Sequence, residues 1–495
     1  MAMFTNYKYL YIPANLNVEE LCVKYTGTEY TGITPDKLAF LCHSLIQVST
    51  KYRNQSDETN GFVPLYSLIL RSKIQNYHVC KQLLIDAEVI QCNEKYCVGE
   101  KSKEFRFCDK YFGTGLKKYA IDPKAFQKYK AVNPKNVIQY KLNSRANHLI
   151  RFLDPENLKL DKKKAYQYLE ESRRKHLQEL QMPSFHGIYL SLADSINNRY
   201  DKYEMIIDQF EESCTDYNID SSGFRFFTVL TNLKKELRNF ITYDSKPLVS
   251  LDFKCSQPYL SLILFNSHFY SSDLSKESVT LKKIYPELYE HLRTRGYLKK
   301  LKQIASNTET LATNVSDVKE YRNSIIDKDY YTSLSNVISA ETGILLSRSE
   351  AKEQSHYIFF GDPKRMNWAG GYKAFKKVYP TVASVLKILK SRNYRDLAIL
   401  LQRIESDLVI NKITKQFVKI FPTVPIYTIH DSLITVQDFT QELVNISNQL
   451  AIKYFRVLPK FEYEEWTESK ALDNIDKIKF SKAERKLIRK IEHSR

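Results

Sequence analysis

Two aspartates stand at the ends of short apolar runs that are typical of β-strands. Asp431 interrupts the stretch IYTIHDSLITVQ at 426–437, where a tight connection between two strands is expected. Asp252 ends the run Leu248–Leu251, and a helix can begin directly after it. Taken singly, a turn aspartate and a helix-capping aspartate are ordinary features of a fold. If the two strands are neighbours in one sheet, both carboxylates come within reach of one pair of metal ions.

The chemistry that such a pair would support is phosphoryl transfer. Hard Mg²⁺ ions prefer oxygen ligands, and two of them held about 3.5–4 Å apart can activate a hydroxyl and stabilise the leaving oxygen of an in-line displacement. The segment after Asp252 favours a strand-to-helix junction, because Ser256 can serve as the N-cap of a helix with Pro258 in its first turn. A metal nuclease could use the same carboxylates, so that alternative stays open.

A third element supplies cations at helical spacing. The stretch SRSEAKEQSHYIFFG, residues 347–361, predicts one helix that ends at Gly361. Its Arg348 and Lys352 lie four residues apart, and Phe360 follows eight residues after Lys352. Such a helix can hold the phosphates of a nucleotide with its cations and the base and sugar with its ring, although a pair of this kind alone is usually a solvated face.

In order and spacing, these elements resemble the A-family DNA polymerases, of the DNA polymerase I type, and the related phage-type single-subunit RNA polymerases. Asp252, followed by Ser256 and Gln257, resembles motif A of that family. The IHDSL segment resembles motif C, in which His430 precedes the second aspartate, Asp431.

Two further segments resemble the same family. The stretch at 347–361 matches motif B, Arg-x3-Lys-x7-Tyr-Gly, in every spacing, with Phe360 in place of tyrosine. Arg225, seven residues before Asn232 in a basic and aromatic segment, is similar to the arginine that contacts the primer terminus. The resemblance covers about residues 220–440 and implies a right-hand fold of palm, fingers and thumb.

The resemblance also implies a role for each motif residue. Asp252 and Asp431, with the backbone carbonyl of Phe253, would bind two Mg²⁺ ions, or Mn²⁺ in their place. The other implied roles are triphosphate binding by Arg348 and Lys352, protonation of the leaving pyrophosphate by Lys352, packing on the nascent base pair by Phe360, and contact with the primer end by Arg225 and His430. The implied partners are a nucleic-acid primer-template, with DNA favoured, and nucleoside triphosphates.

The motifs disagree about the sugar of the nucleotide. The HDS form of motif C is typical of the RNA polymerase branch. Gln257, however, is as long as the glutamate that DNA polymerases use as a steric gate, and Phe360 offers no hydroxyl to a ribose 2′-OH. An unmade hydrogen bond of that kind costs roughly 1–3 kcal/mol, so we expect dNTPs to be preferred over rNTPs. A single-subunit RNA polymerase or primase of the same fold is the alternative.

The composition agrees with a nucleic-acid partner. The chain has 495 residues, 43% of them hydrophobic, which is enough for several domains with their own cores. Its formal net charge is +18, and 35 Tyr and 26 Phe are interleaved with the basic residues. Positive charge together with aromatic rings suits backbone contact and base stacking. The N-terminus lacks the pattern of a signal peptide and the apolar runs are too short to span a bilayer, so we expect a soluble, cytoplasmic protein with no membrane partner.

The elements that must position these residues predict an α+β fold. At 61–113, two helices followed by a β-hairpin resemble a winged-helix module, which can grip duplex DNA or dock a protein. A long basic helix is expected over 155–181, and a basic amphipathic helix at the C-terminus. The expected domains are an N-terminal domain at 1–125 that contains the winged-helix-like module, a helical thumb-like or linker region at 126–245, palm at 246–300, fingers at 301–420, and palm with a basic C-terminal helix at 421–495.

This organisation favours a small replicative or priming enzyme of a mobile element or virus. The rival of another class is a non-catalytic initiator of DNA replication, in which the winged helix binds DNA and the palm is degenerate. Incorporation of nucleotides on a primed template would separate these two readings.

Overall fold

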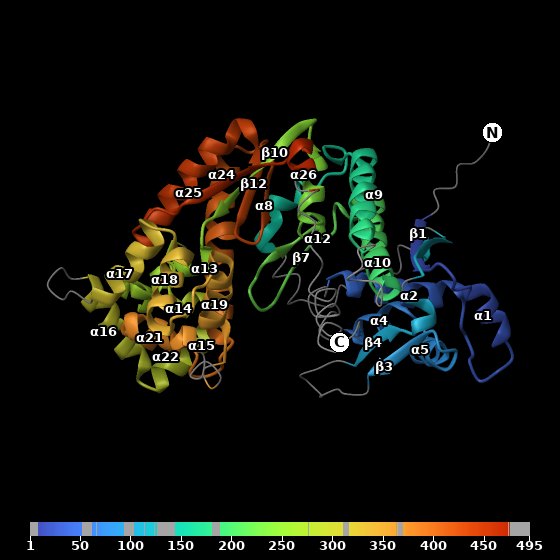
Figure 1. Cartoon of the computed structure of the whole chain (residues 1–495), viewed down its shortest axis with the longest axis horizontal. Coiled ribbons are helices and arrows are strands. Elements are labelled where there is room, and N and C mark those ends of the chain that lie inside the picture. The colour runs from blue at the N-terminus through green and yellow to red at the C-terminus, as the bar shows by residue number, and fades with distance from the viewer. Residues whose placement is uncertain are drawn as a thin grey trace.

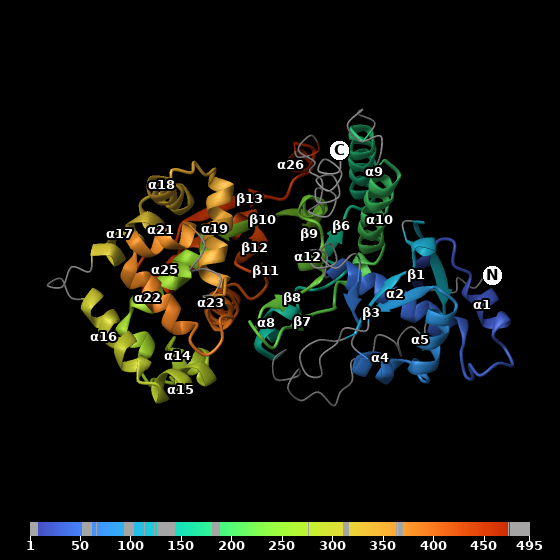
Figure 2. The ribbon, with the colours of Figure 1, turned by 60° about the horizontal axis from the view of Figure 1, so that its bottom comes forward.

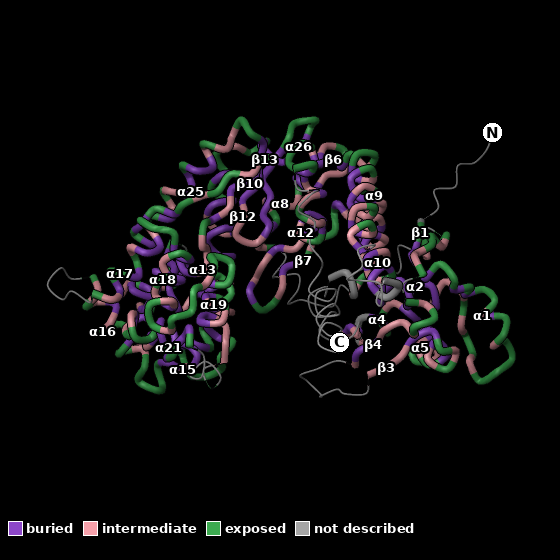
Figure 3. The backbone as a smooth tube through the Cα atoms, viewed as in Figure 1, coloured by how far each residue is buried: buried purple, intermediate pink, exposed green. Residues whose placement is uncertain are grey.

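The computed structural model describes residues 8–51, 62–65, 67–93, 103–112, 114–122, 124–125, 144–180, 189–275, 277–309, 316–362, 364, 370–473 and 475. The fold mixes helices with small antiparallel sheets. Figures 1 and 2 show a helical lobe on one side, the N-terminal unit on the other, and the largest sheet between them. In Figure 3, buried residues follow the central strands and the inner faces of the surrounding helices.

The N-terminal unit has its own hydrophobic core, built around residues such as Leu10, Leu41, Leu83 and Phe105. A three-stranded sheet of order β2-β4-β3 lies with helices α4 and α5, and β1 pairs with β5. In chain order the elements are β1 (Lys8–Pro13), α1 (Val18–Lys24), α2 (Pro35–Lys51), β2 (Val63–Pro64), α4 (Ser67–Lys73), α5 (Tyr77–Asp86), β3 (Ile90–Asn93), β4 (Glu104–Phe107), η1 (Asp109–Tyr111) and β5 (Leu116–Ile121).

A middle segment links this unit to the central sheet. Its two long helices, α9 and α10, lie side by side in both views (Figures 1 and 2). The elements are η2 (Ser144–Ala146), α8 (Asn147–Ile150), β6 (Leu158–Leu160), α9 (Lys162–Glu179), α10 (Tyr189–Asp208), α11 (Phe210–Ser213), β7 (Asn218–Ile219), β8 (Phe226–Phe227), α12 (Val229–Asn232), η4 (Lys235–Phe240) and β9 (Ile241–Tyr243).

One carboxylate joins α10 to the N-terminal unit. The hydroxyls of Tyr11 and Tyr166 both donate to Asp208, and the ammonium of Lys118 lies 2.8 Å from the same side chain. Tyr11 also packs with Met205 in a small buried cluster. Since Tyr11 and Lys118 belong to β1 and β5, the paired strands are fixed against the end of α10.

The central sheet has the order β11-β12-β10-β9-β6, and β13 pairs with β10 on a further edge. Strand β10 (Lys246–Phe253) is buried along most of its length, as expected of a strand that has neighbours on both sides. The other C-terminal elements are β11 (Ile426–Ile429), β12 (Ser432–Val436), η8 (Gln437–Phe439), α25 (Thr440–Phe455), β13 (Phe461–Glu465) and α26 (Glu468–Leu472).

The helical lobe is inserted between β10 and β11, and its core is continuous with that of the sheet. It consists of α13 (Ser256–Ser261), η5 (Leu262–Phe265), η6 (Ser267–Tyr270), α14 (Leu281–Ile284), α15 (Pro286–Thr294), α16 (Tyr297–Glu309), α17 (Ser316–Ile326), α18 (Tyr330–Thr342), α19 (Arg348–Phe360), α21 (Gly370–Val378), α22 (Pro380–Leu389), α23 (Asp396–Ser406), the π-helix η7 (Asp407–Ile413) and α24 (Thr414–Ile420).

Some local expectations need correction. The N-cap of α13 is Cys255, and Ser256 is already the first helical residue. The long helix expected over 155–181 begins only after Asp161, whose side chain caps α9, because Leu158–Leu160 pair with β9 as a strand. The basic C-terminal helix and the tip of the hairpin in the winged-helix-like module lie outside the described residues. Within the described part, no helix combines the length and apolar character that crossing a bilayer requires.

Candidate active site

The two predicted metal-binding aspartates meet at the end of adjacent strands. Asp252 pairs in register with Ser432, the residue directly after Asp431. Because Ile429 pairs with Ser432, His430 and Asp431 form a two-residue turn between β11 and β12. The backbone φ of His430 is 57°, in the left-handed region, where histidine is one of the better tolerated residues. The turn therefore brings the second aspartate beside the first.

Hydrogen bonding and burial set the charge of Asp252. The hydroxyl of Ser432 donates to its carboxylate. Burial raises the pKa of Asp252; the Ser432 hydrogen bond opposes that shift, and the nearby carboxylate of Asp431 adds to it. A bound cation would offset the repulsion between these two partly buried negative charges.

These residues fit a site for Mg²⁺ in the chemistry of their donors. Asp252 and Asp431 offer hard oxygen ligands, and the backbone of Phe253 lies next in the chain at the end of β10. Within the described ranges, no cluster of three or more His, Cys, Asp or Glu side chains suited to a metal is found. A metal here would therefore rest on two carboxylates together with backbone or substrate oxygens.

A polar cavity of about 150 Å³ opens beside Asp252. It is lined on one side by Lys235, Arg238 and Asn239 of η4, and on the other by the sheet. Lys235 forms an ion pair of 2.7 Å with Glu464. The Nε of Arg238 and the Oδ1 of Asn239 are buried and have no hydrogen-bond partner among the described residues. Burial lowers the pKa of Arg238, and Asp252 opposes that shift.

The helix expected from 347–361 is observed as α19 (Arg348–Phe360). It begins with a capping box, in which the side chain of Ser347 accepts from the backbone N–H of Glu350 while Glu350 binds the backbone of Ser347. Arg348 is exposed and forms an ion pair of 2.9 Å with Asp329.

One aromatic ring connects α19 to the aspartates. The ring centroid of Tyr331 lies 5.2 Å from the guanidinium carbon of Arg348 and 5.9 Å from the ammonium of Lys352. Burial raises the pKa of Tyr331; the charge of Arg348 lowers it, and that of Asp431 raises it. Tyr331 therefore lies beside both cations of α19 and feels the charge of Asp431, although the sequence motifs did not single it out.

Phe360 lies at the other end of α19. Its ring centroid is 5.7 Å from that of His356 and 6.2 Å from that of Phe359. The last turn is held by Lys390, whose ammonium donates to the carbonyl oxygens of Ile358 and Gly361 at 2.9 and 3.0 Å. Burial lowers the pKa of Lys390 to about 8.

Arg225 and Gln257, far apart in sequence, share one buried partner. The Nε and Nη2 of Arg225 lie 2.8 and 3.0 Å from the two carboxylate oxygens of Glu405, and the Nε2 of Gln257 lies 2.8 Å from one of them. Glu405 belongs to α23, and its side chain is 2% exposed. The sequence held a signal for it, since Glu405 follows the buried Leu400, Leu401 and Ile404, and a carboxylate beside such residues must find a partner.

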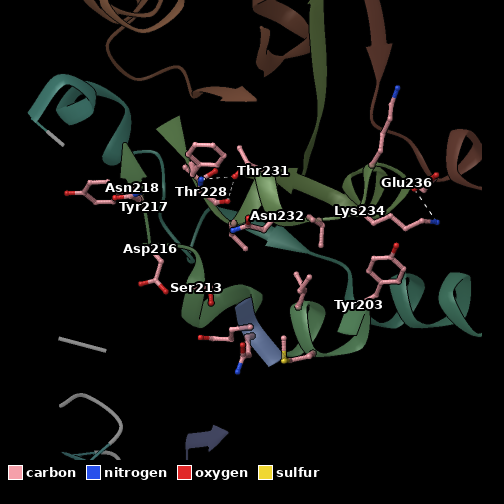
Figure 4. Close-up of a pocket in the computed structure, with 18 residues that line it drawn as sticks. Tyr203, Ser213, Asp216, Tyr217, Asn218, Thr228, Thr231, Asn232, Lys234 and Glu236 are labelled. Carbon is pink, nitrogen blue, oxygen red and sulfur yellow. Dashed lines mark hydrogen bonds and ion pairs between the residues drawn. The ribbon is translucent and has the colours of Figure 1, made fainter. Parts of the chain in front are cut away.

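The ring of His430 lies against Phe227 at 5.6 Å between centroids. Burial, and next the charge of Arg225, lowers the pKa of His430. Phe227 also lines a larger cavity of about 650 Å³, shown in Figure 4. Asn232, Lys234 and other residues of the segment after Arg225 line the same cavity. Lys235, in this segment, also lines the smaller cavity beside Asp252.

Comparisons with known proteins give a likeness to solved structures only. No protein-family model matches the chain, and no curated protein sequence matches it. Among solved structures, the chain is similar to the POL domain of Pol1 from M. smegmatis in complex with a DNA primer-template and dNTP. That match has 10% sequence identity and a TM-score of 0.33, and it covers 67% of this chain and 70% of the other.

Proposed function

We propose that this chain is a template-directed nucleic-acid polymerase, which adds nucleotides to a 3′-hydroxyl and releases pyrophosphate. The observation that carries the proposal is the meeting of Asp252 and Asp431 on adjacent strand ends, together with the two cations that α19 holds beside Tyr331. Paired carboxylates opposite a cationic helix are what a metal-bound triphosphate requires.

In this proposal each side chain has a defined task. Asp252 and Asp431, with the carbonyl of Phe253, hold two Mg²⁺ ions, which when bound lower the pKa of the attacking hydroxyl and stabilise the leaving oxygen. Lys352 is exposed and can donate a proton to the leaving pyrophosphate. Arg348 exchanges Asp329 for the phosphates, since a triphosphate carries more negative charge than one carboxylate.

The same proposal assigns the parts of a right-hand fold. The central sheet with 246–300 and 421–495 forms the palm, 301–420 the fingers, and the helical part of 126–245 a thumb-like element. Phe360 packs on the nascent base pair, while Arg225 and His430 lie beside the primer end. Gln257 crowds a ribose 2′-OH, which favours dNTPs.

A second candidate function follows from the N-terminal unit. The order α2, β2, α4, α5, β3, β4, with β4 between β2 and β3 in the sheet, supports the prediction of a winged-helix-like module. We infer that this unit binds duplex DNA. It would do so in a polymerase, and equally in a non-catalytic initiator.

The test is incorporation of labelled dNTPs or rNTPs by the purified chain on a primed template with Mg²⁺. A polymerase extends the primer, an initiator binds the DNA without extending it, and a metal nuclease shortens it. Extension supports the proposal, and either of the other two results overturns it.

Two variants address the predicted metal-binding residues. Asp252→Asn and Asp431→Asn should each abolish incorporation and leave primer-template binding close to that of the unmodified chain, because phosphate contacts dominate affinity. Asp438→Asn is the matched control, since this aspartate is exposed one turn beyond β12 and pairs only with Lys246 at 2.8 Å among the described residues. Primer extension by either variant at saturating Mg²⁺ would show that Asp252 and Asp431 are not the metal-binding residues.

A further inference from the structure

Glu405 occupies the junction of three parts of the candidate active site. It receives hydrogen bonds from Arg225, which precedes β8, and from Gln257, in the first turn of α13. Burial raises the pKa of Glu405 to about 7; the charge of Arg225 and its hydrogen bonds oppose that rise, and Asp431 adds to it. One carboxylate therefore contacts the proposed sugar gate and the proposed primer-end arginine.

The loop that carries Arg225 is fastened to the same helix as Glu405. The carboxylate of Asp220 accepts from the backbone N–H groups of Gly223 and Arg225, each at 2.7 Å. The hydroxyl of Ser406 donates to the carbonyl of Gly223 at 2.8 Å. A β-carbon at Gly223 would lie 2.6 Å from the side chain of Gln402, so the loop lies directly on α23. Arg225 thus reaches Glu405 from a fixed loop.

The loop is also held from both sides at its tip. Phe224 has a φ of 59°, which is unusual for a bulky residue and must be stabilised by its surroundings. The guanidinium carbons of Arg145 and Arg403 lie 4.2 and 4.4 Å from the centroid of its ring. A loop fixed by this many contacts presents Arg225 in one orientation.

Gln257 has a different arrangement. Its Nε2 is held by Glu405, whereas its Oε1 is buried without a hydrogen-bond partner among the described residues. Both carboxylate oxygens of Glu405 accept from Arg225, so Glu405 presents an acceptor to Gln257 and selects the amide orientation in which Oε1 has no partner. A buried acceptor without a partner needs an explanation, and the sugar 3′-hydroxyl, which dNTPs and rNTPs both carry, is a donor that could supply one.

We propose that Glu405 is a positioning residue for nucleotide selection, which fixes the amide of Gln257 toward the sugar of the incoming nucleotide and couples it to Arg225 at the primer end. The inference rests on the proposed polymerase function and deepens it. Stability alone does not explain this arrangement, because a buried ion pair often stabilises the folded chain no more than apolar residues of the same volume do. A carboxylate that orders two substrate-contacting side chains has a specific reason to be there.

The test measures single-nucleotide incorporation of a dNTP and the matching rNTP on one primed template. Glu405→Ala should lower the ratio of kcat/KM for dNTP over rNTP by about two- to tenfold, since one net hydrogen bond of roughly 0.5–1.5 kcal/mol no longer fixes Gln257. Glu405→Gln can still accept from Gln257, so it should keep most of the selectivity while losing the charge that holds Arg225. If Glu405→Ala fails to fold, Glu405→Leu fills the same space without accepting from Gln257 and should lower the ratio in the same way.

A double-variant cycle separates positioning from a general loss of structure. In the Gln257→Ala background, Glu405→Ala should change the dNTP to rNTP ratio no further, because the side chain it positions is absent. Glu341→Gln is the control, since this carboxylate belongs to an ion pair with Lys377 at the surface. Additive effects, or an unchanged ratio in both Glu405 variants, would overturn the inference while leaving the polymerase intact. An unmodified chain that incorporates neither nucleotide would overturn the polymerase and this inference with it.

Discussion

At the scale of single residues, the sugar preference of the proposed polymerase would depend on Gln257 and Phe360, whose surroundings in the fold differ. Gln257 is held by Glu405 close to Asp252, whereas Phe360 lies at the far end of α19 among aromatic neighbours. Gln257 is therefore the more restricted of the two, and we expect it to carry most of any discrimination against a ribose.

Gln257→Gly should raise rNTP use relative to dNTP use, because it removes the bulk that crowds a 2′-OH. Gln257→Gly with Phe360→Tyr should raise it further, since the new hydroxyl can hydrogen-bond the ribose. The full effect corresponds to roughly 1–3 kcal/mol, or about 5- to 150-fold. Single-nucleotide competition measures it. If the unmodified chain already prefers rNTPs, Gln257 is no gate, and the RNA polymerase or primase reading replaces the DNA polymerase one.

At the scale of elements, α19 is the helix that would bind the nucleotide in the proposed function. Its first turn carries the cations beside Tyr331, and its last turn is fixed by Lys390 of the loop after α22. We make a separate prediction for each end of α19. The prediction for the N-terminal end concerns triphosphate binding, and the prediction for the C-terminal end concerns stability.

Lys352→Ala and Arg348→Ala should weaken nucleotide use without changing primer-template affinity. In the proposed function their charges serve the triphosphate, which is absent when DNA binds alone. Steady-state kinetics give kcat/KM for the nucleotide, and binding at several salt concentrations gives the salt slope. Lys377→Ala, exposed on the neighbouring α21, is the control. A reduced salt slope with normal incorporation would instead make α19 a contact to the DNA backbone.

Lys390→Met should remove one pH-dependent component of stability. Burial lowers the pKa of Lys390 in the folded chain to about 8, below the 10.5 of a free lysine, so the unfolded chain binds more protons between these values. Stability from this group consequently rises as pH increases from about 8 to 10.5, by at most about 3 kcal/mol. Denaturant unfolding at pH 7.5 and 10 should show this rise in the unmodified chain and less of it in the variant.

Lys387→Met is the matched control for that measurement, since Lys387 lies on α22 and is exposed. Its variant should follow the unmodified chain at both pH values. If Lys390→Met shows the same pH response as the unmodified chain, then the pKa of Lys390 is not lowered by folding.

At the scale of the whole molecule, the N-terminal unit and the remainder have separate cores that meet at α10. The contacts of Tyr11 and Lys118 with Asp208 form part of this junction. If the N-terminal unit binds DNA in a polymerase, its removal should therefore affect loading onto duplex DNA without affecting catalysis.

Removal of residues 1–125 should spare elongation on a preformed primer and impair loading onto duplex DNA. Primer extension and duplex binding are measured on the same truncated chain. Tyr11→Phe in the full chain is the control, because it weakens the junction while keeping the unit in place. Equal loss of elongation and loading would show that the unit is an integral part of the polymerase fold.

The sequence by itself determined the elements whose signals are local. The helix that ends at Gly361, the paired strands around His430 and Asp431, and the strand with Asp252 near its end are observed where they were expected. Neighbouring residues fix such elements through backbone hydrogen bonds and side-chain caps, so they can be read from short stretches. The domain boundaries, the winged helix and the roles of the site residues remain predictions.

The tertiary structure alone decided which distant residues meet. Glu405, Tyr331 and Lys390 join the site through contacts with segments far away in the chain, and β13 pairs with β10 although nothing local requires it. The helix α9 begins later than expected for the same reason, since Leu158–Leu160, at the start of the expected helix, pair with β9 as strand β6. Partners of buried polar groups are chosen by the packing of the whole chain, because each must be satisfied wherever the fold leaves it, and no sequence window contains that information.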